Sequence, residues 1–109
     1  TLDYPFELVE QIVYDYNLSI CLDIGHLLLH GLPYEDYLDR YFEKTRVVHL
    51  HGIIDGKDHS NISSISPDQL SLLMSFFSRN KDGNRVVSLE VFNEKDLTVS
   101  LDILKSFST

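Results

Sequence analysis

Three short apolar segments, separated from one another by helix-like stretches, constrain the fold of this chain more than any other feature. The segments are Leu18–Ile24, Arg46–His51 and Arg85–Phe92. Gly25 closes the first segment, and the turn-forming residues Lys81-Asp82-Gly83-Asn84 precede the third. The length and β-branched content of these segments suit buried strands. Strands that alternate with crossover helices form a parallel sheet, so the sequence predicts an α/β fold with three parallel strands and four helices.

Four stretches between and around these strands space their apolar residues three and four apart, as an amphipathic helix does. The first covers about residues 5–16, and the second contains the run Tyr34–Phe42. The third opens on the capping box Ser66-Pro67-Asp68-Gln69, and the fourth follows the capping residue Asn93. Residues 52–66 form a polar segment that is long for a loop, so we expect function there.

Composition indicates one ordered globular domain, residues 1–109, with 43% hydrophobic and 24% charged residues. Nine lysines and arginines against seventeen aspartates and glutamates give a net charge of −8, which repels phosphate backbones and disfavours nucleic acid as a partner. No apolar stretch approaches the roughly 20 residues that span a bilayer, and no basic-then-apolar leader opens the chain, so no membrane partner is expected. The single cysteine, Cys21, suits a reducing interior, and we expect a cytoplasmic protein.

Acidic and imidazole side chains stand at the C-terminal end of each predicted strand. Asp23 ends the first strand, and His26 follows three residues later. His49 and His51 share one face of the second strand, because side chains alternate with period two. Glu90 ends the apolar run of the third strand. In a parallel α/β fold these ends form the face on which sites are assembled.

Each of these residues also has a simpler explanation when it is taken alone. Asp23 could cap the following turn, His26 could simply pack, and a lone buried histidine is usually a satisfied core residue. A carboxylate such as Glu90 at the end of a buried strand is costly, however, unless partners meet it there. Asp58 and His59 add a further pair in the polar loop. The convergence of all these groups favours a shared divalent-metal site.

These residues resemble the xylose isomerase-like, or endonuclease IV-like, superfamily of (β/α)₈ barrels, which includes sugar-phosphate isomerases and epimerases. The shared pattern is an Asp-x-x-His pair, a later His followed by an Asp-His loop, and a terminal Glu. The resemblance covers essentially the whole chain and implies the C-terminal part of a TIM (β/α)₈ barrel, strands six to eight of eight. It also implies a divalent metal, zinc or manganese, with the ligands Asp23, His26, His49, Asp58, His59 and Glu90.

Five short motifs are more narrowly similar to the cobamide-remodelling phosphodiesterase branch of that superfamily. They are Tyr4-Pro5-Phe6, Cys21–His26, His49–Gly52, Asp58-His59 and Leu89–Phe92. The similarity implies a metal-dependent hydrolase that cleaves the nucleotide loop of a cobamide, with a small molecule as its substrate. Glu90 and His51 are the catalytic candidates of such an enzyme.

Several alternatives stay open. A sugar-phosphate isomerase or epimerase would use the same metal to stabilise an enediolate, and cleavage of abasic DNA is disfavoured by the acidic balance. His51 stands where related members carry Asn, which leaves open whether it supports a metal ligand or contacts the substrate. The adjacent Asp58 and His59 leave it open which of the two binds the metal. The family's earlier strands supply further ligands, so we expect the isolated chain to be an inactive fragment. Its bare strand edges predict self-association.

Overall fold

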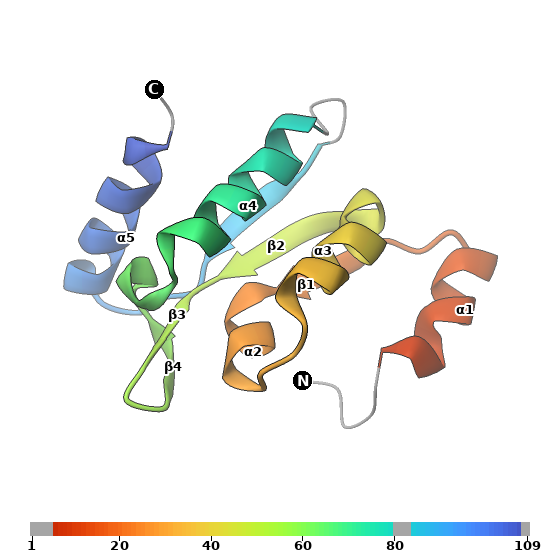
Figure 1. The fold of residues 1–109 in the computed structure, drawn as a ribbon, viewed down its shortest axis with the longest axis horizontal. Coiled ribbons are helices and arrows are strands. Elements are labelled where there is room, and N and C mark those ends of the chain that lie inside the picture. Colours follow the sequence, from red (N-terminus) through yellow and green to blue (C-terminus); the bar gives the residue numbers. More distant parts are fainter. Residues whose placement is uncertain (1–5, 80–83, 108–109) are drawn as a thin grey trace.

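The computed structural model describes residues 6–79 and 84–107. Within these residues the chain forms five α-helices, two 3-10 helices, a three-stranded parallel sheet and a two-stranded hairpin (Figure 1). It is therefore mixed α/β, as the alternation of strands and helices predicts. In chain order the elements are α1 (Glu7–Asp15), β1 (Ile20–Asp23), α2 (Ile24–Leu29), α3 (Tyr34–Tyr41), η1 (Phe42–Lys44), β2 (Thr45–Leu50), β3 (Gly52–Ile54), β4 (Lys57–Ser60), η2 (Ile62–Ser64), α4 (Pro67–Arg79), β5 (Val86–Leu89) and α5 (Glu94–Ser106).

The parallel sheet has the strand order β1-β2-β5, and its register sets the positions of the candidate site residues. Asp23 lies beside His49, and His49 lies beside Ser88. The ladder continues one residue past β5, because the Glu90 N–H donates to the Leu50 carbonyl oxygen at 2.9 Å. The carboxyl ends of all three strands therefore lie side by side at one end of the sheet.

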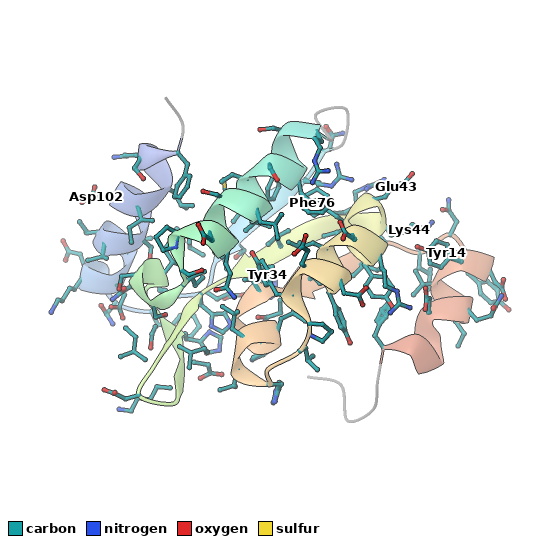
Figure 2. The ribbon with its side chains drawn as sticks, in the orientation of Figure 1. Tyr14, Tyr34, Glu43, Lys44, Phe76 and Asp102 are labelled. Atoms are coloured by element: carbon teal, nitrogen blue, oxygen red, sulfur yellow. The ribbon has the colours of Figure 1, made fainter. Side chains whose placement is uncertain are left out.

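The main core lies between the sheet and helices α3 and α4, which run across it side by side in Figure 1. Leu22, Val48 and Leu50 supply buried side chains from the strands. Tyr34 and Phe76 lie between the two helices in Figure 2, and the Tyr34 hydroxyl donates to the Gln69 carbonyl oxygen of α4 at 2.9 Å. Burial raises the pKa of the Tyr34 phenol, so this donor keeps its proton at neutral pH.

Helix α1 joins the domain through a second, smaller cluster. Val13 packs with Ile20 and Tyr41 there. Figure 2 shows Tyr14 and Lys44 at this junction, with the Lys44 ammonium 5.4 Å from the centre of the Tyr14 ring. None of the helices in the described residues has the length and apolar content needed to cross a bilayer.

Both predicted helix caps are present. The Gln69 N–H donates to Ser66 Oγ at 3.1 Å, and the Ser66 N–H donates to Gln69 Oε1 at 3.4 Å, which is a reciprocal capping box. Asn93 Oδ1 accepts from the Asp96 N–H at 2.8 Å at the start of α5. The predicted turn at residues 81–84 lies, apart from Asn84, outside the described residues, as does the start of the first predicted helix.

The predicted loop at residues 52–66 is wrong. The segment folds into the hairpin β3–β4 and the 3-10 helix η2. Asp55 and Gly56 both have positive φ, 52° and 76°, as the two central residues of a type I′ hairpin turn require. This Asp-Gly signal is in the sequence. The strand that follows it, Lys57-Asp58-His59-Ser60, has no apolar residue and so lacks the pattern that predicts a strand.

The prediction of four helices, with Gly25 closing the first strand, is also wrong, because the described residues contain a fifth helix, α2. Strand β1 ends at Asp23, and α2 begins at the next residue, so Gly25 lies inside a helix. Asp23 caps this helix, because its Oδ1 accepts from the His26 N–H at 2.9 Å. A glycine is required here because the His51 ring packs closely against this position. A Cβ at residue 25 would lie 1.9 Å from His51 Cε1.

One face of the sheet is open in the single chain. Cys21, Val47 and Val86 form a row across the three strands, with Cys21 exposed and Val86 59% exposed. Among the described residues, β1 and β5 each pair with β2 alone, which leaves their outer edges free for another strand.

We expect this chain to self-associate through the open face and the two edges. Val86→Lys should shift the assembly towards monomer, because it places a charge in the exposed apolar row. Ile54→Lys, a change of the same kind at a 38% exposed position of the hairpin, serves as the control. Light scattering over a concentration series measures the mass. A monodisperse monomer of the unchanged chain would contradict this prediction.

Candidate metal centre

Asp23 lies at the centre of the candidate site. It is the last residue of β1, and its side chain is 22% exposed. Oδ1 accepts from the His26 N–H and lies 3.0 Å from His51 Nε2. Oδ2 lies 3.2 Å from His26 Nδ1 and 3.7 Å from His49 Nδ1. A single carboxylate therefore contacts three of the chain's five histidines.

The neighbouring strands bring His49 and Glu90 to the same place. His49 stands beside Asp23 in the sheet register, and Glu90 follows the end of β5. The distance from His49 Nδ1 to Glu90 Oε1 is 3.3 Å. The structure therefore brings Asp23, His49 and Glu90 together, where the ends of the three predicted strands placed them.

A second group forms around Asp58 of the hairpin. Asp58 Oδ2 lies 3.5 Å from His26 Nε2 and 3.6 Å from His59 Nε2. The opposite nitrogen of each ring is occupied: His26 Nδ1 faces Asp23, and His59 Nδ1 lies 2.9 Å from the Glu90 carbonyl oxygen. These partners favour the proton on Nδ1 in both rings, and the two Nε2 lone pairs are then left on the side of Asp58.

That arrangement is the one that metal-binding histidines adopt. Such a residue donates its second ring N–H to a carboxylate or backbone carbonyl, which fixes the ring and its tautomer. With the protons on Nδ1, the two Nε2 atoms and Asp58 Oδ2 are all acceptors, so they repel one another unless a cation or a proton lies between them. The donor set of nitrogen and oxygen atoms suits zinc, manganese and similar divalent ions.

His51 completes a histidine cluster at the base of this group. One nitrogen each from His26, His51 and His59 lies within 4.8 Å of the other two, a spacing that fits a metal ion. His51 is fully buried, and its ring stacks on His59 with the ring centres 4.4 Å apart. The structure thus brings all seven predicted site residues into one connected set of contacts.

The carboxylates make this end of the open sheet face negative. The pKa of the Cys21 thiol, one row below Asp23 on the same face, is raised. Partial desolvation of the thiol by its neighbours is the largest cause, and the negative charges of Asp23 and Glu90 add to it. A bound cation would offset the same negative potential.

A groove of about 960 Å³ runs from the site along the outer side of β1. Apolar side chains from α1, β1, α2 and α3 line most of it, and Asp23, His26, His49, His59 and Glu90 lie along its polar part. His30 also lines the groove, one helical turn after His26, with the two ring centres 6.2 Å apart. The sequence prediction missed this residue, although the i, i+4 spacing in an Asp-capped helix signals it.

Comparisons of the chain with protein-family models, with curated proteins and with solved structures found no match. The resemblance to the isomerase-like barrels rests on the sequence motifs alone and stays a prediction.

Proposed function

We propose that this chain is the C-terminal part of a (β/α)₈ barrel and carries most of a divalent-metal centre, zinc or manganese, of a phosphodiesterase. The observation that carries the proposal is the meeting of Asp23, His49 and Glu90 at the carboxyl ends of three parallel strands. Barrel enzymes assemble their sites at that end, with helices outside the sheet and side chains filling the inside. The open sheet face with its row of small side chains corresponds to the inside.

The residues that would hold the metal form two donor groups. Asp58, His26 and His59 form one donor group, and Asp23, His49 and Glu90 form another. A divalent cation held there would supply Lewis-acid chemistry, polarising a phosphoryl oxygen and lowering the pKa of water. Glu90, 3.3 Å from His49, can accept a proton from the water that attacks phosphorus, and the pair can return a proton to the departing ester oxygen.

The substrate class is inferred from the charge and from the motif resemblance. The net charge of −8 opposes a polyanionic nucleic acid. A cobamide is a small molecule with a single phosphodiester, which agrees with this charge argument and with the motif resemblance.

Activity of the full-length protein that contains this chain tests the proposal. Metal-loaded protein is incubated with a cobamide, and release of the nucleotide loop is followed by chromatography. We expect Glu90→Gln and His49→Ala each to lower turnover by at least about 100-fold, since each removes a metal ligand or a proton acceptor. Asp102→Asn, an exposed acid on α5 (Figure 2), should leave turnover unchanged.

Two outcomes would contradict the proposal. Turnover that survives both substitutions would show that these residues do not carry the reaction. Conversion of a ketose or ketose phosphate, with no action on cobamides, would replace the phosphodiesterase with an isomerase or epimerase on the same centre.

A further inference from the structure

His51 is a polar side chain with no exposure to solvent. It follows β2 directly, and its side chain is 0% exposed, whereas that of His49, two residues earlier, is 33% exposed. An imidazole buried to this extent must have partners for both ring nitrogens, because an unsatisfied buried polar group is costly.

Both partners are present, and together they fix the tautomer. The backbone N–H of His59 donates to His51 Nδ1 at 3.0 Å, and since an amide N–H can only donate, Nδ1 must carry a lone pair. The Gly52 carbonyl oxygen is farther from the same nitrogen, at 3.4 Å. The proton of the neutral ring is therefore on Nε2, which donates to Asp23 Oδ1 at 3.0 Å. No lone pair of His51 is left for a metal, so of the three clustered imidazoles His26 and His59 remain as ligand candidates.

These two hydrogen bonds orient two groups of the proposed metal centre. Asp23 Oδ1 is occupied by the His51 N–H and the His26 N–H, so Oδ2 remains on the side of His26 and His49. His59 has φ 56°, a left-handed conformation that residues other than glycine seldom adopt. Its N–H to His51 and its Nδ1 to the Glu90 carbonyl oxygen hold it there.

Gly25 makes room for this arrangement. A Cβ at residue 25 would lie 1.9 Å from His51 Cε1 and 2.2 Å from each ring nitrogen. Only glycine lets α2 pass this close to the imidazole, so the helix that carries His26 is fitted to the ring of His51.

We infer that His51 is a positioning residue of the proposed metal centre: it orients the Asp23 carboxylate and holds the left-handed backbone of His59, and it is neither a ligand nor the general base. This inference rests on the proposed metal centre. Of the roles that the sequence leaves open for His51, it selects support of a ligand over substrate contact and over the catalytic role.

Two substitutions at one position test the inference. The amide of His51→Gln keeps an acceptor for the His59 N–H and a donor for Asp23, whereas His51→Leu has a similar size and neither group. The affinity for Zn²⁺ is measured by competition with a chromophoric chelator. We expect His51→Leu to bind Zn²⁺ about 10–100-fold more weakly than the unchanged chain, and His51→Gln to recover most of that loss. Equal losses in both variants would overturn the inference.

A cobalt spectrum separates positioning from ligation. The visible bands of bound Co²⁺ report the ligand set, so His51→Gln at saturating Co²⁺ should keep the spectrum of the unchanged chain. His49→Gln, a ligand substitution by the same residue type, should change it. A spectrum altered as strongly by His51→Gln as by His49→Gln would make His51 a ligand.

A measurement on the metal-free chain distinguishes failure of this inference from failure of the proposed function. Nitrogen-15 NMR of the imidazoles at pH 8 should show His51 protonated on Nε2 alone. A proton on Nδ1 would overturn the inference whatever the metal affinity. If the tautomer is as expected but the full-length protein that contains this chain binds neither Zn²⁺ nor Co²⁺, the proposed function is overturned, and with it the role assigned to His51.

Discussion

Replacing Gly25 with alanine is expected to lower the free energy of unfolding by about 3 kcal/mol, the upper end of the usual range for an overpacked core. The new methyl group would lie 1.9 Å from His51 Cε1, far inside van der Waals contact. The ring has no free space to move into, since it is fully buried and stacked on His59. Any displacement that relieves the clash also breaks its hydrogen bonds to Asp23 and to the His59 N–H.

Urea denaturation at one fixed protein concentration measures this effect. Gly31→Ala is the matched control: residue 31 has φ 61° with nothing within 4 Å of the added Cβ, so only the left-handed conformation costs energy, about 1 kcal/mol. The double variant Gly25→Ala/His51→Ala should be more stable than the sum of the single effects predicts, because the two residues are in contact. A Gly25→Ala protein as stable as Gly31→Ala would show that the ring is not held as described.

The sheet and its principal helices could be predicted because their signals are local. Each strand is a short apolar run, and the reciprocal bonds of Ser66 with Gln69 and the Asn93 cap depend on residues three apart. Alternation with period two placed His49 and His51 on one face, and both do contact Asp23. In a parallel sheet the carboxyl ends of the strands lie at the same end of the sheet, so no further information from the sequence is needed to bring them together.

What could not be predicted depends on packing between distant segments. The complete burial of His51 requires the hairpin to fold back, so that the His59 N–H reaches its ring, and requires α2 to start directly after Asp23. A glycine after a strand usually forms part of a turn. Gly25 instead leaves space for the side chain of His51, 26 positions later, which the sequence does not indicate. The left-handed conformation of His59 likewise depends on partners distant in the sequence, the His51 ring and the Glu90 carbonyl oxygen.

Removal of the central carboxylate should have the largest effect on metal binding. Loss of a residue that hydrogen-bonds to a metal ligand weakens metal binding by roughly 10–100-fold. Asp23→Asn is expected to weaken Zn²⁺ binding by more than this, because Asp23 is both a ligand candidate and a hydrogen-bond partner of other ligand candidates. Its side chain lies within 3.7 Å of nitrogen atoms of three histidines, His26, His49 and His51. The substitution also removes a negative charge. An NH₂ group in the place of Oδ1 would face two N–H donors, those of the His26 backbone and of His51 Nε2.

Asp58→Asn gives the informative comparison. Asp58 is 41% exposed, and its ion-pair contacts among the described residues are with the Nε2 atoms of His26 and His59, so its loss should weaken binding less than that of Asp23. Asp102→Asn on α5 should leave binding unchanged, and the metal content after dialysis checks each titration. Asp23→Asn with an affinity within about threefold of the unchanged chain would mean that the carboxylate only caps α2. In that case Asp58, together with His26 and His59, would have to hold the ion without the strand residues, and Asp58→Asn would become the more damaging change.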